Sequence, residues 1–289
     1  LIPMKHQIAI VGSATRDRIL HGSESQLKWG GVVVYSGLTL SWLRINTAIA
    51  TNVANCDKTL VELLTKAGIS TDIGDTPVTT EFVNHISGDH RDQELLASAT
   101  PISAEQVSRI ADSTDHLYLG ALHPLDIDPK ALATLKDVRR VSVDIQGYTR
   151  RIQDGKVHKG ICEDLPLALD CADIVKASRD ETEAAEAFFG QTTAAIMEQF
   201  KIDQWLTTDG GNGGWLLDHA SGRHDFDVVP VADVRDPTGA GDVFFAAYLT
   251  YFVYEDAGID EALRQAAALT AAQVAGDFIT ADELSRSAA

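Results

Sequence analysis

Short apolar runs alternate with amphipathic stretches along most of this chain of 289 residues. Residues 6–11 and 45–53 are compatible with buried strands, while 32–43 and 58–67 have helical patterns, the second closed by Gly68. The alternation continues through 117–119, 129–135, 141–144, 174–176, 181–189, 205–208 and 243–253. Strands and helices that take turns predict an α/β protein, in which a mainly parallel sheet is covered by helices on both faces.

One stretch departs from this alternation. Residues 79–86 and 91–96 have strand composition and flank the polar tetrapeptide 87–90, which predicts a β-hairpin. The pattern fits a lid over a site and an edge hairpin of the sheet equally well. Because the chain shows no repeat, low-complexity tract or linker, we expect residues 1–289 to form a single domain with a small β lid contributed mainly by residues 78–97.

Composition and charge narrow the classes of partner. Acidic residues outnumber basic ones by 42 to 24, and the net charge of −18 argues against nucleic acid and anionic membranes. The cysteines Cys56, Cys162 and Cys171 have no CxxC spacing, so neither a disulfide framework nor a zinc site is indicated. No apolar run is long enough to cross a bilayer, and the N-terminal residues lack the features of a signal peptide. We therefore expect a cytoplasmic protein.

The heptapeptide Asp236-Pro237-Thr238-Gly239-Ala240-Gly241-Asp242 carries the clearest chemistry. Its small residues let the backbone approach an anion, and a helix that begins there directs free N–H groups and its positive dipole end at that anion. Asp242, in the first helical turn, can then take a proton from a hydroxyl that attacks a phosphoryl group. The pattern predicts phosphoryl transfer to an alcohol, although Asp and Gly are also common in plain loops and helix caps.

Other phosphate and hydrolase signatures are absent from the sequence, namely GxxxxGK[ST], GxGxxG after a strand, HExxH and GxSxG. Their absence disfavours a P-loop enzyme and a dinucleotide oxidoreductase. The heptapeptide instead resembles the C-terminal signature of the ribokinase or PfkB-like carbohydrate kinase family, and four further elements follow that family's order along almost the whole chain.

The resemblance implies a ribokinase-like three-layer α/β/α sandwich with a β lid, and ATP and Mg²⁺ as cofactors. It assigns the general base to Asp242 and the stabilisation of the transferred group to the N–H groups of Gly239, Ala240 and Gly241. Asp236 resembles the family position near a bound monovalent cation, which makes K⁺ a further candidate cofactor. Relatives often pair through their lids, so the resemblance also suggests a homodimer.

The four further elements supply the other expected contacts. Residues 11–17 resemble the first strand and loop of the family and imply that Asp17 binds substrate hydroxyls, while Gly30 and Gly31 resemble its N-terminal Gly-Gly, where bare backbone meets the substrate. Glu181 resembles the Glu that organises Mg²⁺ through water. The residues implied for binding the cofactor are Lys176, Ser178, Thr208, Gly210, Gly213 and Thr238. Taken singly, each element also fits an ordinary turn, cap or hairpin.

Departures from the family pattern bear on the acceptor. Ser178 replaces an Asn of the family's NxxE element, and Tyr35 stands where ribokinases have the Asn that contacts ribose, which disfavours ribose. The segment 32–35 has no Lys or Arg, which disfavours a phosphorylated sugar. The Gly-Gly-x-x-x-Tyr form resembles inositol-kinase-like members, whereas stacking of Tyr35 and Phe82 on a base would suit a nucleoside kinase. Both aromatic residues also fit an ordinary core.

Further polar candidates for the acceptor pocket are Asn84 and Arg91 on the hairpin, near Gln93, and Asp144 after the middle strand, near Gln146. Arg91 also fits a plain solvated charge, and we expect His123 to be structural. The combined prediction is an ATP-dependent kinase that phosphorylates a hydroxyl of a small, non-phosphorylated sugar or polyol. A nucleoside kinase is the alternative, and a non-catalytic binding protein with the same fold is the alternative of another class. A hydroxymethyl-pyrimidine or pyridoxal kinase is disfavoured by the Gly-Gly and the lid.

Overall fold

The computed structural model describes residues 5–21, 24–87, 90–135 and 138–288. Within these residues, the larger sheet has nine strands in the order β15-β14-β13-β12-β9-β8-β1-β4-β5. Its neighbours pair in parallel except at β13–β14 and β14–β15. The strands are β1 (Ile8–Gly12), β4 (Thr47–Asn52), β5 (Ser70–Gly74), β8 (His116–Gly120), β9 (Arg140–Asp144), β12 (Ile174–Ser178), β13 (Gln204–Thr208), β14 (Gly214–Asp218) and β15 (Gly222–Phe226).

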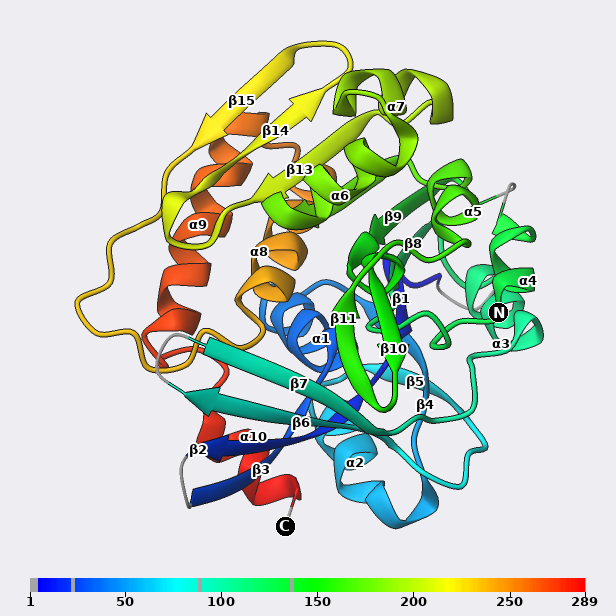
Figure 1. The fold of residues 1–289 in the computed structure, drawn as a ribbon, viewed down its shortest axis with the longest axis vertical. Coiled ribbons are helices and arrows are strands. Elements are labelled where there is room, and N and C mark those ends of the chain that lie inside the picture. The colour runs from blue at the N-terminus through cyan, green and yellow to red at the C-terminus, as the bar shows by residue number, and fades with distance from the viewer. Residues whose placement is uncertain (1–4, 22–23, 88–89, 136–137, 289) are drawn as a thin grey trace.

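Helices cover both faces of this sheet (Figure 1). One face carries α1 (Val32–Trp42), α2 (Lys58–Lys66), α8 (Ala240–Leu249) and α9 (Ile259–Val274). The other carries α3 (Ala104–Ala111), α4 (Pro129–Leu132), α5 (Leu165–Asp170), α6 (Arg179–Phe189) and α7 (Thr193–Phe200). Successive β1 residues divide between the two cores, with Ile8 and Ile10 in one and Ala9 and Val11 in the other, as the alternation of strand side chains requires. The predicted three-layer sandwich with a mainly parallel sheet is confirmed.

A second sheet lies at one end of the sandwich, below the larger sheet in Figure 1. In the described part of the chain it has six strands in the order β10-β11-β7-β6-β2-β3. They are β2 (Thr15–His21), β3 (Glu24–Gly30), β6 (Thr80–Ser87), β7 (His90–Ala97), β10 (Arg150–Gln153) and β11 (Lys156–Lys159). The predicted hairpin is present as β6 and β7. The other four strands were not predicted. Strand β2, for example, follows β1 after only Ser13 and Ala14, and its charged residues are typical of a loop.

The C-terminal region completes the layer that holds α8. The helical pattern predicted for residues 243–253 is present in two parts, since α8 ends at Leu249 and a π-helical turn, η5 (Thr250–Tyr254), follows. Helix α10 (Ala281–Ala288) packs against β3 and α2. Over the described residues, no helix combines the length and the apolar character that a membrane span requires.

Candidate active site

The turn that leads into α8 forms the backbone cradle predicted from the heptapeptide. Gly239 is the N-cap of α8 in the left-handed conformation (φ 74°), and a methyl group there would collide with the Tyr35 ring beneath it. The Ala240 N–H donates to the Pro237 carbonyl at 3.2 Å, so this amide is engaged within the turn. Gly241 and Asp242 occupy the first turn, where N–H groups have no partner inside the helix, and their amides are therefore the ones directed at an anion.

Asp242 lies in this first turn with the ionisation behaviour of a general base. Burial raises the pKa of its carboxyl to about 7, with the Asp144 charge adding to the rise and the Lys176 and Arg150 charges opposing it. A base whose pKa lies near neutral pH combines a useful ionised fraction with a strong tendency to accept a proton. The position and the pKa both suit the role predicted for Asp242.

A buried ion pair faces the cradle from the larger sheet. Lys176 and Asp144 are register partners on β12 and β9, and the distance from Lys176 Nζ to Asp144 Oδ2 is 2.7 Å. Burial opposes the charge of Lys176, but Asp144, Glu181 and Asp242 outweigh it and hold the pKa of the ammonium above its ordinary value. A Cβ at Gly241 would lie 3.2 Å from Lys176 Nζ. The ammonium group is therefore adjacent to the backbone that would hold the anion.

The N-terminus of α6 places two predicted cofactor residues. Ser178 caps this helix by accepting from the Glu181 N–H at 3.3 Å, and Glu181 Oε2 accepts from the Ser178 N–H at 2.6 Å, which is a complete capping box. No three His, Cys, Asp or Glu side chains converge on one point among the residues that the structure describes. Mg²⁺ keeps most of its water ligands and needs only one or two carboxylates, so a rigid Glu181 that influences Lys176 and Asp242 electrostatically fits water-mediated binding.

The predicted acceptor residues lie on the second sheet and at its junction with α1. Asp17 is buried on β2, and a side chain at Gly30 would collide with its carboxylate, so this glycine leaves room for Asp17. Gly31 is the N-cap of α1 with a φ of 86°, and a Cβ there would collide with the Ser13 carbonyl. The two glycines therefore allow close packing of the chain around Asp17 and Ser13, and contact of their backbone with a substrate stays a prediction.

The structure also places the aromatic and lid candidates. Tyr35 is 1% exposed beneath Gly239, and Phe82 is 1% exposed on β6, so both rings belong to the core. Asn84 is buried on β6, and its Oδ1 accepts from Gln93 Nε2 at 3.0 Å across the hairpin. The side chain of Arg91 lies outside the described residues. Asn84 and Gln93 thus form a joined polar pair, while Tyr35 supports the cradle from below.

Arg150 is a site residue that the sequence patterns missed. It begins β10, is half-buried, donates to the Leu122 carbonyl at 3.0 Å and lowers the pKa of Asp242 through its charge. With Gln93, Ser178 and Glu181 it lines a cavity of about 310 Å³ between the second sheet and the start of α6. The position of Arg150 shortly after the strand end at Asp144 could have pointed to it, but a short exposed strand has no distinctive hydrophobic pattern.

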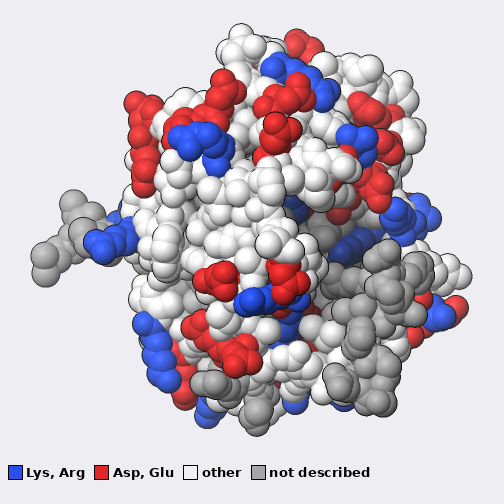
Figure 2. All heavy atoms as spheres, turned by 90° about the vertical axis from the view of Figure 1, so that its left-hand side faces the viewer, with Lys and Arg blue, Asp and Glu red and all other residues white. Residues whose placement is uncertain are grey.

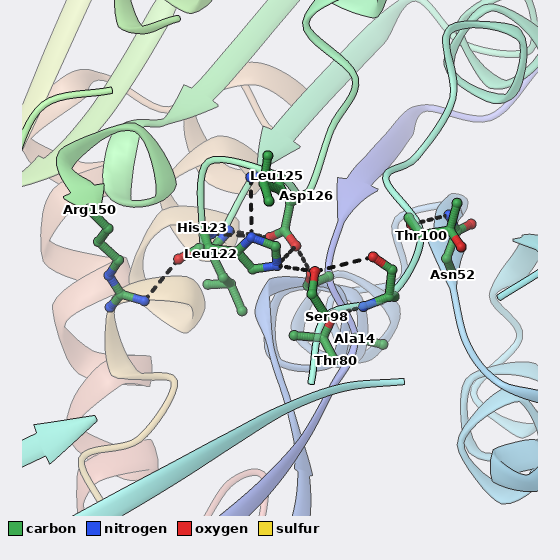
Figure 3. Close-up of polar contacts among 12 residues, drawn as sticks. Ala14, Asn52, Thr80, Ser98, Thr100, Leu122, His123, Leu125, Asp126 and Arg150 are labelled. Atoms are coloured by element: carbon green, nitrogen blue, oxygen red, sulfur yellow. Dashed lines mark hydrogen bonds and ion pairs between the residues drawn. The ribbon is translucent and has the colours of Figure 1, made fainter. Parts of the chain in front are cut away.

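A Ser-His-Asp cluster beside this region is structural, as predicted for His123 (Figure 3). Leu125 N–H donates to His123 Nδ1 at 3.2 Å, which leaves Nε2 to carry the proton toward Asp126 Oδ1 at 2.7 Å. Ser98 Oγ lies 3.4 Å from the same Nε2, so the ring has no second nitrogen with which to relay a proton from serine to carboxylate. The cluster instead holds the loop after β8 against the loop after β1, where Ser13 also donates to Asp126.

An apolar cavity of about 420 Å³ adjoins the other side of the cradle. Its walls come from the segment 226–237 and from α8 and α9, and they include Phe226, Val229, Phe244 and Val274. The predicted residues Thr208, Gly210 and Gly213 line one end, and Ala240 and Gly241 line the end toward Asp242. Figure 2 views this side of the molecule, where a broad uncharged area lies between groups of Asp and Glu.

Asp236 and Thr238, which open the turn, are bonded to each other and to the second sheet. The Thr238 N–H donates to Asp236 Oδ1 at 3.0 Å, and Lys28 Nζ on β3 lies 2.7 Å from Asp236 Oδ2. A monovalent metal ion was the expected partner of Asp236, whereas the described structure pairs this carboxylate with an ammonium group of the chain itself.

Comparisons with known proteins agree with this geometry. A structure described as a pyrophosphate-dependent kinase in the ribokinase family, complexed with a pyrophosphate analog and myo-inositol, is similar over 93% of this chain and 95% of that chain, with a TM-score of 0.80 and 21% identity. The ribokinase from Thermotoga maritima is similar over 98% and 99%, with a TM-score of 0.75 and 20% identity. Adenosine kinase from Schistosoma mansoni is similar over 94% and 96%, with a TM-score of 0.78 and 13% identity.

These likenesses establish the ribokinase-like fold that the sequence predicts. No curated protein sequence is similar enough to count as a match. The model of the pfkB family of carbohydrate kinases matches residues 8–280, nearly the whole chain, and includes every element of the site described above. The chain therefore belongs to the pfkB carbohydrate kinase family, whose members are phosphotransferases with a hydroxyl group as acceptor.

Proposed function

We propose that this kinase transfers the γ-phosphoryl group of ATP to a hydroxyl of a small, non-phosphorylated polyol or sugar, with an inositol-like acceptor favoured. The proposal rests on one observation, that the apolar cavity, the glycine turn and Asp242 adjoin one another. The apolar cavity ends at Ala240 and Gly241, and the next residue is Asp242 with a pKa of about 7. The proposed general base, the backbone amides proposed to bind the anion and an apolar cavity large enough for a nucleobase thus adjoin one another at a single turn.

The apolar cavity supports ATP as the donor. Pyrophosphate is small and highly charged, so a kinase that used it would gain nothing from a mostly apolar cavity lined by Phe226, Val229 and Phe244. An adenine ring has two apolar faces, and a volume of about 420 Å³ is in the range of small-ligand pockets. The phosphates would then extend from Thr208 and Gly213 toward Gly241 and Lys176.

The chemistry follows from the side chains around the cradle. Asp242 accepts the proton of the acceptor hydroxyl as its oxygen attacks the γ-phosphorus. The N–H groups of Gly241 and Asp242 and the ammonium group of Lys176 stabilise the negative charge on the transferred group. Mg²⁺, when bound through water near Glu181, supplies further neutralisation of the donor phosphates.

The acceptor pocket favours neutral hydroxyl groups. The buried ammonium group of Lys28 is paired with Asp236 at 2.7 Å, and that of Lys176 lies beside the backbone proposed to hold the transferred phosphoryl group, so neither is assigned to a phosphate already on the acceptor. Asp17 and the Asn84–Gln93 pair offer the acceptors and donors that vicinal hydroxyls require. A nucleoside acceptor is less favoured because the Tyr35 and Phe82 rings are buried. A homodimer through the second sheet is part of the same proposal.

A donor-by-acceptor matrix tests the proposal. Purified protein with Mg²⁺ is given ATP, ADP or pyrophosphate together with myo-inositol, other polyols, ribose, fructose, 2-keto-3-deoxygluconate, cytidine or adenosine, and phosphorylated product is followed by mass spectrometry. The expected result is product from ATP and an inositol or related polyol. Product from pyrophosphate alone would overturn the donor assignment, and turnover confined to nucleosides would overturn the acceptor assignment.

A further inference from the structure

Lys28 is a buried charge that none of the sequence patterns explains. It lies on β3 with 1% of its surface exposed, and its Nζ is 2.7 Å from Asp236 Oδ2, across 208 positions of sequence. Placing an ammonium group in the interior is costly unless a counter-charge and hydrogen bonds compensate. The role of Lys28 is therefore tied to Asp236, the first residue of the heptapeptide.

Oxygen atoms around Asp236 already accept from nitrogen donors of the chain. Asp236 Oδ1 accepts from the Thr238 N–H at 3.0 Å, while Oδ2 faces Lys28. The Thr238 carbonyl accepts from Gln273 Nε2 at 3.2 Å, and the same amide group is within 3.3 Å of the Ile279 carbonyl. Gln273 is fully buried, and its Oε1 accepts from the Ile279 N–H at 3.0 Å. Hard cations need several oxygens directed at one point, and here those oxygens are directed at nitrogen atoms.

We infer that the Lys28 ammonium group takes the place of a monovalent metal ion beside Asp236, so that this kinase works without K⁺. The expected cation site thus does not fit a metal ion in this chain. Lys28 is a positioning residue, because it acts on the cradle through Asp236 rather than on the substrates. The inference rests on the proposed kinase function.

The path from Lys28 to the chemistry is short. Asp236 and Thr238 begin the turn whose next residue, Gly239, is held in the left-handed conformation before α8. A fixed positive charge on Asp236 stabilises the carboxylate that holds the Thr238 N–H, and so fixes the direction of the amides that follow. The pKa of Asp236 agrees with this pairing, since burial raises it but the Lys28 charge outweighs burial and leaves it below its ordinary value.

Lys28 also connects the cradle to the acceptor side of the site. Lys28 and Asp17 are directly opposite on β3 and β2, so their side chains leave the same face of the strand pair. A free metal ion would touch only the turn, whereas a lysine is covalently part of the second sheet. The ammonium group thus joins the strand pair that carries Asp17 to the turn that carries the anion seat.

The first test uses the wild-type protein in KCl, NaCl, NH₄Cl or choline chloride at equal ionic strength. Initial rates are expected to agree within ~2-fold, and melting temperatures are expected not to depend on the cation. A site with a Kd of ~10 mM would raise the melting temperature by ~3 °C at 100 mM K⁺. A K⁺-selective rise in melting temperature, or a several-fold K⁺ activation, overturns the inference. Melting needs no substrate, so it tests Lys28 even if no acceptor in the panel is phosphorylated.

The second test removes the charge. In Lys28→Met we expect kcat in choline chloride to fall by ~10-fold or more, and K⁺ or NH₄⁺ to restore a large part of it and to raise the melting temperature. Lys28→Arg, which keeps the charge, should remain insensitive to the cation. The matched control is Lys5→Met, which removes the exposed 2.7 Å pair with Asp115. A folded Lys28→Met protein whose rate and melting temperature ignore K⁺ overturns the inference, and the wild-type series decides the matter if that variant does not fold.

Discussion

Replacing Asp242 by Asn removes the proposed base while keeping the shape of the side chain. General-base catalysis contributes ~10²–10⁴-fold to rate, so kcat should fall by at least ~100-fold, a loss of about 3 kcal/mol of transition-state stabilisation. Binding of ATP should change little, because the apolar cavity and the glycine backbone remain. For the wild type, kcat/KM should rise tenfold per pH unit below about pH 7 and level off above it, since the base must be ionised. That dependence should vanish in the variant.

The same substitution should stabilise the folded protein above neutral pH. The folded-state pKa of Asp242, about 7, lies above the ordinary 3.8 because burial penalises the ionised form, so the folded state binds more protons than the unfolded state between those values. Stability contributed at this position therefore declines as the pH rises from about 4 to about 7. Allowing for partial solvent access, the cost is on the order of 2 kcal/mol at pH 8. Asp242→Asn should recover that amount at pH 8 and much less at pH 4.

Two measurements check this reasoning on the same preparations. Coupled detection of ADP from pH 5.5 to 9 gives the rate profile, and urea unfolding at pH 4.5 and 8 gives the free energy of unfolding. Asp260→Asn is the control, because Asp260 also lies in the first turn of a helix, α9, but is exposed and pairs with His224. Retained turnover in Asp242→Asn, or a variant that is less stable than the wild type at pH 8, would refute the assignment of Asp242 as a base with a raised pKa.

Three further substitutions probe the surroundings of the base. Gly239→Ala should cost more than ~2 kcal/mol in urea unfolding, because φ is 74° and the Tyr35 ring fills the space, whereas Gly258→Ala, which meets nothing within 4 Å, should be nearly neutral. Ala271→Leu should raise the KM for ATP by ~10-fold by narrowing the apolar cavity, without changing the KM for the acceptor. The control is Ala268→Leu, because Ala268 is exposed. An unaffected KM for ATP would contradict the binding of adenine in this cavity. Asp126→Asn should destabilise the fold by ~3 kcal/mol, as loss of a buried charged partner does.

The main fold was predictable because its signal is local. Strands β1 and β4 are buried along their whole length, and β1 is apolar throughout, as is typical of strands buried on both faces. The hairpin β2–β3 has no apolar pattern of this kind. In β2 the charged Arg16 and Arg18 flank the buried Asp17, and β2 begins almost directly after β1. Strand β2 is fixed by pairing with β6, and a pairing between strands so distant in the sequence leaves no local pattern.

The residues of the candidate site also differ in how far the sequence could predict them. The heptapeptide pointed to the proposed base and cradle because the backbone geometry there demands particular small residues. Tyr35 was harder to place, since the sequence gives its position in a helix but not the direction of the ring, which the structure directs under Gly239. Lys28 and Arg150 were missed altogether. Their roles depend on charges contributed by other elements, and the only local signal was the position of Arg150 shortly after the strand end at Asp144.

Two of the three carboxylates around the cradle, Asp236 and Asp144, are paired with an ammonium group. Lys28 pairs with Asp236 and Lys176 with Asp144, while among the described residues Asp242 forms no ion pair with a lysine and shares the electrostatic influence of Lys176 with Asp144. Burial is the main cause of the raised pKa of Asp242, and the neighbouring Asp144 charge adds to it. A third buried lysine would lower the pKa of Asp242 and weaken the base. Loss of Lys176 would raise this pKa further and remove a positive charge from the proposed anion site. The two supporting carboxylates thus each face an ammonium group, while Asp242 is left as the proposed proton acceptor.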